Sequence, residues 1–332
     1  MPKITVCMNT ARGDNSIDAY PNMHIFEFLM KSLREQTFKD FEVVIADVLW
    51  NERKTYFMDY PESFFIRHVP VKPNIWIDKG YCAISTTKNT CLLYATGEVI
   101  VFTDDCSQLQ PKHLEMVLDK IEKNKCISNT YYIYKGGEEL VFKDVRNPTI
   151  NYSGAYGNVS LYLEDYLELN GYNEIFDGSR GLEDCELSLR MKSKGMTIDL
   201  IDYPVIYQSH NRGYPKQSNI NLRCPRLAEV LSYNPSRRNI YKANTIQYTN
   251  KELEVFLECS NIVKGHRCKY VKNIKGENVE CKSGIVEDGT AKYKDKKLIL
   301  KMYKHPSLIF NLKEQREDIP KTLKELEILC TQ

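Results

Sequence analysis

The stretch that decides the fold is residues 98–107, EVIVFTDDCS, an apolar strand that ends on two adjacent carboxylates, Asp104 and Asp105. It follows a helical stretch over residues 82–95, which Gly97 ends. Three further short apolar runs precede it along the chain: KITVCM at 3–8, EVVIA at 42–46 and FFIRHV at 64–69. Short β-branched runs that alternate with helical stretches are typical of parallel strands with crossover helices. We therefore expect an α/β fold that begins with a Rossmann-like βαβαβ half.

Further helices are expected from apolar periodicity. In HIFEFLMKSLREQ, residues 24–36, apolar side chains recur at helical spacing. The segments LYLEDYLEL (161–169) and GLEDCELSLRMKSKG (181–195) also read as helices, and Gly195 ends the second. A strand over residues 196–201 then leads to SHN, after which the pattern loosens. We expect a main domain over residues 1–211 and a smaller α+β or helical accessory region over residues 212–332.

Composition predicts a globular chain in a reducing compartment. The chain has 332 residues, of which 42% are hydrophobic, enough for one α/β domain and an appendage. No run approaches the ~18 consecutive apolar residues that a membrane helix needs, and the first residues lack the apolar core of a secretion signal. The 11 cysteines are odd in number, and most lie where small buried side chains are expected, so a disulfide framework is not expected. We expect a cytoplasmic protein.

Charge is distributed unevenly along the chain. Residues 1–210 carry 22 Lys and Arg against 30 Asp and Glu, whereas residues 211–332 carry 24 against 14. A basic region on an acidic body is compatible with contact to phosphates, to an anionic membrane surface or to an acidic acceptor. A solvated face without any partner explains the same composition. Nucleic acid is not an expected partner.

The adjacent carboxylates of Asp104 and Asp105 indicate a cation site. Neighbouring carboxylates repel each other, so a site usually holds them with a cation, and hard oxygen ligands select Mg²⁺ or Mn²⁺. Such an ion can neutralise the charge that develops on a leaving diphosphate. The pair is equally compatible with two turn aspartates, one of which caps the following helix.

A second carboxylate pair, Glu183 and Asp184, lies in the first turn of the helix predicted over residues 181–195. One of the two could be a general base that takes the proton of an acceptor hydroxyl. The helix dipole also favours carboxylates at this position, which explains them without function. His210, which follows the last predicted strand, could be a third metal ligand or a structural histidine.

The order of these segments resembles glycosyltransferase family 2 of the GT-A fold. The resemblance covers residues 3–212 and rests on six segments: KITVCMNT (3–10), LREQTFKDFEVVIAD (33–47), TTKNTCLLYATGEVIVFTDDCS (86–107), YGNVSLYLEDYLELNGYNEIFDG (156–178), GLEDCELSLRMKSKG (181–195) and SHN (209–211). It implies a Rossmann-like mixed sheet flanked by helices. It also implies an enzyme of the hexosyltransferase type.

The resemblance assigns roles to single residues. It places Thr10 and Asp47 at the nucleobase and ribose, and a basic-Asn pair, Lys88 and Asn89, near the nucleotide. Asp104 and Asp105 stand for the metal-binding Asp-x-Asp motif, and His210 lies where many relatives add a metal ligand. Glu183 is implied as an acceptor contact, and Asp184 as the catalytic base.

Two departures from the family pattern weaken parts of this assignment. The motif's second Asp is replaced by Cys106, which leaves open whether Asp104 or Asp105 binds the metal directly. After the second strand the chain reads Asp47-Val48-Leu49-Trp50 in place of an acidic-Gly-Ser phrase, so the nucleobase preference does not carry over. Trp50 could stack on a base or pack in the core.

The expected function is the transfer of a sugar from a nucleotide-diphosphate donor, with a UDP-sugar favoured, to a hydroxyl of a glycan, glycolipid or protein. The expected mechanism is a metal-assisted direct displacement with inversion, with Mn²⁺ or Mg²⁺ as the ion. A sugar-phosphate nucleotidyltransferase would need a Gly-rich basic loop after the first strand, and NTARGDNS (9–16) is a poor version of one. A carbohydrate- or nucleotide-binding module without turnover would lack the metal carboxylates or the base, and this chain has both.

One more group of potential metal ligands lies in the accessory region. Cys259, His266, Cys268 and Cys281 are four side chains of the kind that bind tetrahedral zinc. Their spacing is not that of a standard zinc finger, and free thiols in a small reduced domain explain them as well.

Overall fold

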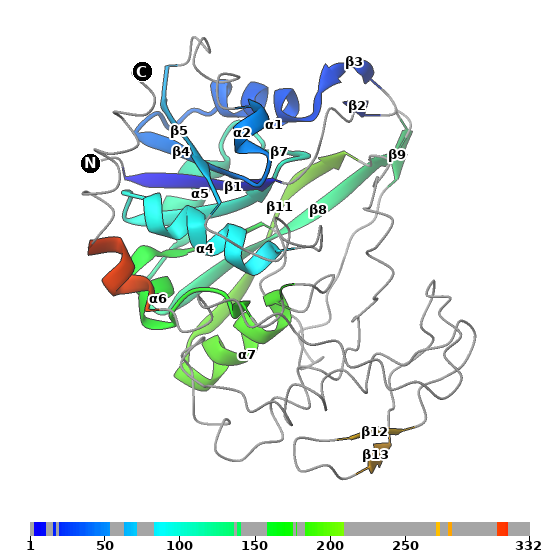
Figure 1. Ribbon diagram of the computed structural model, residues 1–332. Coiled ribbons are helices and arrows are strands. Elements are labelled where there is room, and N and C mark those ends of the chain that lie inside the picture. Colours follow the sequence, from blue (N-terminus) through cyan, green and yellow to red (C-terminus); the bar gives the residue numbers. More distant parts are fainter. Residues whose placement is uncertain are drawn as a thin grey trace.

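The computed structural model describes residues 3–10, 16–17, 20–53, 63–71, 83–135, 138–140, 158–174, 177, 183–208, 270–272, 278–280 and 311–317. A mixed sheet of nine strands dominates this part of the chain, in the order β5-β4-β1-β6-β10-β8-β11-β7 with β9 paired to β8 (Figure 1). Its strands are β1 Ile4–Thr10, β4 Phe41–Asp47, β5 Phe65–Pro70, β6 Val99–Asp104, β7 Ser107–Gln108, β8 Lys125–Lys135, β9 Glu138–Leu140, β10 Val159–Tyr162 and β11 Thr197–Gln208. The labelled helices of the described residues are α1 Ile25–Arg34, α2 Trp50–Arg53, α4 Ile84–Tyr94, α5 His113–Lys120, α6 Leu163–Glu168 and α7 Glu183–Lys194. Two small antiparallel strand pairs lie outside this sheet: β2 Ser16–Ile17 with β3 Tyr20–His24, and β12 Tyr270–Lys272 with β13 Asn278–Glu280.

The parallel half of the sheet is the βαβαβ unit that the sequence predicts. Strands β5, β4, β1 and β6 are hydrogen-bonded in parallel, in that order. Strands β1, β4 and β6 form because their apolar side chains are buried on both faces, as parallel sheets require, whereas β5 is a partly exposed edge strand. In β1, Ile4, Val6 and Met8 enter one core cluster, while Cys7 between them enters the other. The predicted strands and the predicted helices at 24–36 and 82–95 are confirmed.

Helices cover both faces of the sheet. On one face, α1 and α5 bury Leu29, Met30 and Leu33 of α1 and Leu114 and Val117 of α5 against the strands. On the other face lie α4, α6 and α7, which contribute Leu92, Tyr166 and Leu187 among others to the second core cluster. The rings of Tyr166 and Tyr172 pack edge-on against Phe102 of β6, with centroids 5.5 Å away in both cases. Helices α4 and α7 are thus anchored on the same face of one sheet.

The other half of the sheet is mixed. Strand β10 pairs antiparallel with both β6 and β8, and β11 runs parallel to β8. The sequence does not reveal β8, whose CISNTYYIY run mixes polar and aromatic residues without clear alternation. The sequence pattern also predicts a helix that includes residues 161–162. In the structure these residues end β10, and α6 begins at Leu163. The mixed sheet flanked by helices that the GT-A resemblance implies is confirmed.

The region predicted as an accessory part is described in three short pieces, 270–272, 278–280 and 311–317. Two of these pieces are the strands β12 and β13, which pair with each other in antiparallel orientation. Residues 312–317 are helical, and Leu312 is fully buried in the core cluster beneath α4 and α6. The boundary between the two predicted regions stays a prediction. Across the described residues, the helices are too short or too polar to cross a membrane.

Candidate active site

Polar side chains gather where the parallel strands end. Thr10 at the end of β1 lies opposite Asp47 at the end of β4, and Asn9 lies opposite Asp104 at the end of β6. Asp105 follows directly and accepts a hydrogen bond from the Thr10 hydroxyl at 2.9 Å, with both side chains buried. In open α/β sheets, ligands bind just beyond these strand ends. The structure therefore brings the predicted residues Thr10, Asp47, Asp104 and Asp105 to one edge of the sheet.

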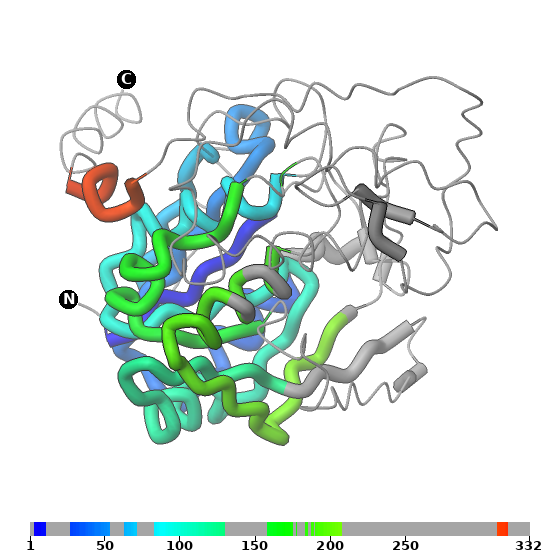
Figure 2. The backbone as a smooth tube through the Cα atoms, turned by 90° about the horizontal axis from the view of Figure 1, so that it is seen from below, coloured from blue at the N-terminus to red at the C-terminus, as the bar shows by residue number. Residues whose placement is uncertain are grey.

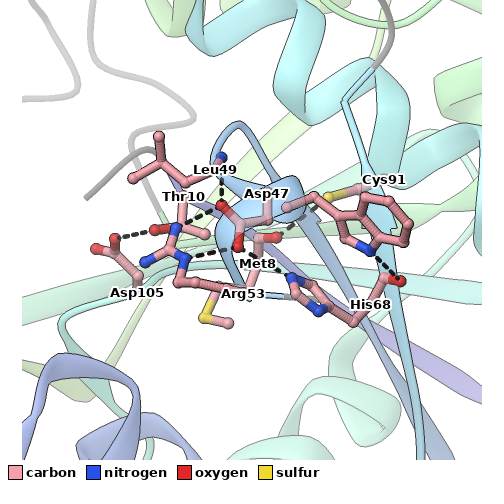
Figure 3. A network of polar contacts seen from close by, with 9 residues as sticks. Met8, Thr10, Asp47, Leu49, Arg53, His68, Cys91 and Asp105 are labelled. Atoms are coloured by element: carbon pink, nitrogen blue, oxygen red, sulfur yellow. Dashed lines mark hydrogen bonds and ion pairs between the residues drawn. The ribbon is translucent and has the colours of Figure 1, made fainter. Parts of the chain in front are cut away.

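Asp47 lies at the centre of a buried polar network (Figure 3). Its oxygens accept hydrogen bonds from the Leu49 amide at 2.8 Å and from Arg53 Nε at 2.9 Å, and a second Arg53 nitrogen forms an ion pair with it. His68 Nε2 of β5 lies 3.0 Å from the same carboxylate. Burial alone raises the pKa of Asp47, but the hydrogen bonds from His68 and Arg53 outweigh it and hold the pKa below its usual value. Asp47 is therefore an ionised carboxylate at neutral pH.

These contacts define what Asp47 can do. A carboxylate offers about four acceptor positions, and the contacts within the protein already engage both oxygens of Asp47. Asp47 therefore orients the Arg53 guanidinium, a residue that the sequence analysis did not single out. Trp50 of α2 is half-buried, and its indole N–H donates to the His68 carbonyl at 3.2 Å, which fixes α2 over β5. Contact of Thr10 and Asp47 with a nucleobase or ribose stays a prediction.

A second charged group lies between α4 and α7. The Lys88 ammonium of α4 lies 3.4 Å from Glu183 Oε1 of α7 and 4.6 Å from the centroid of the Tyr172 ring. Burial alone would lower the pKa of Lys88, but the charges of Tyr172, Glu183, Asp184 and Asp104 raise it above its usual value. Lys88 is therefore a permanent buried cation, and its electrostatic neighbours include carboxylates of both predicted pairs.

Glu183 and Asp184 differ in environment although they are adjacent. Glu183 is 5% exposed, and burial raises its pKa, against the opposing effect of Lys88. Asp184 is partly exposed. A base must reach an acceptor that arrives from solvent, so this difference favours Asp184 as the base and Glu183 as the partner of Lys88.

Asn89, the second member of the predicted basic-Asn pair, is fully buried and contacts the protein. Its amide nitrogen donates to the Tyr172 carbonyl and to Glu174 Oε1, both at 2.9 Å, and its oxygen accepts from the Tyr172 amide at 2.7 Å. Gly171 has φ +68°, and a Cβ there would lie 2.3 Å from Asn89 Oδ1. Asn89 thus holds the turn that sets Tyr172 beside Lys88. A contact of Asn89 with the nucleotide stays a prediction.

Asp177 is a site-shaping residue that the sequence analysis missed. Its carboxylate accepts the backbone N–H of Ser85 at 2.9 Å and of Thr86 at 3.1 Å, and the Thr86 hydroxyl also donates to it. These N–H groups belong to the first turn of α4 and have no partner inside the helix. Burial raises the pKa of Asp177 to about 8, with Glu174 adding to the rise and the donated hydrogen bonds opposing it. Asp177 therefore caps the helix that carries Lys88.

The metal that the resemblance implies would be held by Asp104 and Asp105. Within the described part of the chain, no three or more His, Cys, Asp or Glu side chains are grouped so as to hold an ion. His210 lies outside the described residues, as do Cys259, His266, Cys268 and Cys281. A divalent ion at a phosphate site needs only one or two carboxylates, because phosphate oxygens and waters complete its shell. The donor set of Asp104 and Asp105 fits such an ion.

Comparison with known proteins adds a similarity over residues 140–211. A family model described as the N-terminal domain of galactosyltransferase matches residues 140–211, which include α6, α7 and β11. No curated protein sequence matches the chain.

Similar solved structures are distant. S. aureus TarS 1-349 is 16% identical, with 62% of this chain and 60% of that chain covered and a TM-score of 0.45. The same protein in complex with UDP-GlcNAc is also 16% identical, covering 71% and 68% with a TM-score of 0.47. Mannosyltransferase PcManGT from Pyrobaculum calidifontis, in complex with GDP-Man and Mn2+, is 16% identical, covering 64% and 59% with a TM-score of 0.43. The chain thus spans less than two thirds of the first of these relatives. Over residues 140–211 it is similar to a galactosyltransferase domain, which confirms the glycosyltransferase resemblance that the sequence predicts.

Proposed function

We propose that the chain is a glycosyltransferase of the hexosyltransferase type that moves a sugar from a nucleotide-diphosphate donor to an acceptor hydroxyl by direct displacement, with inversion. The observation that carries this proposal is that one buried cation, Lys88, interacts with carboxylates of both pairs, Asp104 and Glu183. Asp104, at the end of β6, is an electrostatic neighbour of Lys88, and Lys88 is paired with Glu183 of α7. The galactosyltransferase similarity over residues 140–211 supports it, because that segment carries Glu183 and Asp184.

Lys88 is suited to a diphosphate beside Asp104. Its charge is permanent and shielded from water, so its attraction for a phosphate is stronger than that of an exposed lysine. A divalent ion such as Mn²⁺ or Mg²⁺, held by Asp104 and Asp105, would supply further neutralisation of the leaving diphosphate. Arg53, held by Asp47 at the ends of β1 and β4, is a second cation at the same edge of the sheet.

Asp184 would then act on the acceptor. In a displacement with inversion, the attacking oxygen approaches the face of the sugar opposite the leaving group, so the base and the phosphate-binding groups come from different elements. Asp184 and Glu183 begin α7, whereas Asp104 ends β6. Asp184 takes the proton from the acceptor hydroxyl, and Glu183 contacts the acceptor or holds Lys88.

The donor is proposed to be a UDP-sugar, and the acceptor a glycan, glycolipid or protein hydroxyl. We also propose a cytoplasmic location, with contact to an anionic surface through the basic residues of the region 212–332.

A panel of UDP- and GDP-sugars, each with and without Mn²⁺, tests the function by thermal shift. A donor at 100 times its Kd stabilises the folded state by about 2.7 kcal/mol, which is readily measured. We expect one donor class to raise the melting temperature and to be hydrolysed slowly without acceptor. The Asp104→Asn/Asp105→Asn double variant is expected to lose the dependence on Mn²⁺. Stabilisation by a nucleoside triphosphate with a sugar 1-phosphate, and by no nucleotide sugar, would contradict the proposal.

A further inference from the structure

The helix that carries Lys88 is held at its far end by a residue from the other end of the chain. The guanidinium of Arg316 donates to the carbonyls of Leu92, Leu93 and Ala95, at the end of α4. The Arg316 Nη1 to Leu93 distance is 3.3 Å, and the Nη2 to Ala95 distance is 2.8 Å. Figures 1 and 2 show the short red helix of residues 312–317 beside α4 and α6 from two directions.

An arginine matches this position physically. The last four carbonyls of a helix have no partner inside the helix, and the negative end of the helix dipole lies there. A guanidinium offers several N–H groups in a rigid plane, so one side chain can bind more than one carbonyl at once. Arg316 therefore serves as a tertiary cap for α4, at the end opposite Asp177.

The same segment also reaches the turn below Lys88. Leu312 is fully buried, and its backbone N–H donates to Asn170 Oδ1 at 2.8 Å. Asn170 has φ 56° and is followed by Gly171, where an added Cβ would lie 3.2 Å from Leu312 Cδ2. This is the turn that Asn89 holds and that sets Tyr172 beside Lys88. Residues 311–317 thus contact both elements that fix Lys88.

We propose that Arg316 is a positioning residue of the active site. It acts directly on the end of α4 and, through Leu312 of its own short helix, on the 170–172 turn, and so holds Lys88 in its place beside Asp104 and Glu183. This inference rests on the proposed function, because it assigns Lys88 to donor binding. A segment that merely anchored a loose tail would change stability but not donor affinity.

The test compares full-length variants. Arg316→Met removes the N–H groups that bind the three carbonyls and keeps the length of the side chain, whereas Lys313→Met removes an exposed cation from the same short helix. Arg316→Lys keeps the charge but loses the planar set of donors. Hydrogen exchange by mass spectrometry follows peptides that cover residues 84–94 and 170–174, and calorimetry measures the binding of UDP with Mn²⁺ well below each variant's melting temperature.

We expect Arg316→Met to accelerate exchange in both segments and to weaken UDP binding ~10-fold, less than the ~10²-fold rate loss that a 1 Å misplacement of a reacting group can cause. Arg316→Lys should be intermediate, and Lys313→Met should match the parent chain. Faster exchange with unchanged UDP affinity would overturn the positioning role, and so would unchanged exchange. A parent chain that fails to bind UDP would instead count against the proposed donor, and the exchange data would still show whether Arg316 fixes α4.

Discussion

Asp184 and Glu183 show how two adjacent carboxylates come to differ. Glu183 is turned toward the Lys88 ammonium and is almost inaccessible, whereas Asp184 remains partly exposed. The buried partner balances the charge of Lys88, and the accessible one can meet a substrate. The two side chains differ in exposure because consecutive residues of a helix point about 100° apart around its axis, and both lie in the first turn of α7.

Asp184→Asn should lower the rate of sugar transfer by ~10²- to 10⁴-fold, the usual contribution of a general base. Asn has nearly the same shape but cannot take a proton, so donor affinity and its dependence on Mn²⁺ should be retained. Initial rates under saturating donor measure the loss, with Asp119→Asn, an exposed change on α5, as the control. A near-normal rate of transfer would show that Glu183 or another residue is the base. A product with retained anomeric configuration would contradict inversion.

Much of the site could be predicted from single residues, because strand ends in a parallel sheet meet at one edge. Thr10, Asp47, Asp104 and Asp105 each lie at or just beyond the end of a strand that the sequence predicts, so their meeting at one edge is predictable. The sequence could not show that the Asp47 carboxylate binds Arg53 and His68, because those contacts depend on how α2 folds back over β5. Nor could it separate a base from a helix cap at Glu183 and Asp184, because both roles favour a carboxylate in a first helical turn.

At the scale of the element, the 170–174 turn depends on a glycine. Gly171→Ala should destabilise the fold by more than ~1 kcal/mol, because alanine is strained at φ +68° and its Cβ would clash with Asn89. Gly195→Ala is the matched control, since Gly195 has φ +84° but nothing within 4 Å of an added Cβ. Urea unfolding compares the two, and UDP binding is expected to weaken only for Gly171→Ala. Equal effects of the two changes would show that Asn89 can move aside.

The Asp177 cap makes α4 sensitive to pH. Burial raises the pKa of Asp177 from its ordinary value of 3.8 to about 8 in the folded chain, so the folded state binds a proton more tightly over that interval. The contribution of Asp177 to the free energy of unfolding should therefore fall as pH rises from about 4 to about 8. Asp177→Asn should flatten this slope, whatever it does to absolute stability. Urea unfolding at several pH values measures the slope, with the exposed Asp202→Asn as the control; a slope unchanged by Asp177→Asn would contradict the prediction.

Elements were predictable where burial dictates pattern and not elsewhere. The strands β1, β4 and β6 are buried on both faces, which gives the unbroken apolar runs that the sequence displays. Strand β10 spans four residues and runs directly into α6, too short a stretch for periodicity to separate it from the helix. Asp177 caps α4 across 92 positions of sequence, and no local pattern reports such a contact.

At the scale of the whole molecule, Leu312 joins the short helix of residues 312–317 to the core of the sheet. Leu312→Ala should cost ~2–5 kcal/mol, the usual range for a large-to-small change at a fully buried site. Leu200→Ala is the control, because Leu200 on β11 is 44% exposed and its loss should matter little. Chemical unfolding measures both. Similar small losses for the two leucines would mean that the segment does not share the core of the sheet.

The tie between Arg316 and α4 also has a consequence during synthesis. Arg316 lies 224 positions after Leu92, so α4 emerges from the ribosome long before its cap exists. At ~5–20 residues per second this interval is on the order of ten to forty-five seconds. During that time the parallel strands can assemble from local contacts, while the helix that carries Lys88 lacks one of its two end restraints. A nascent chain would thus acquire its sheet early and the final placement of its buried cation only after residue 316 has been translated.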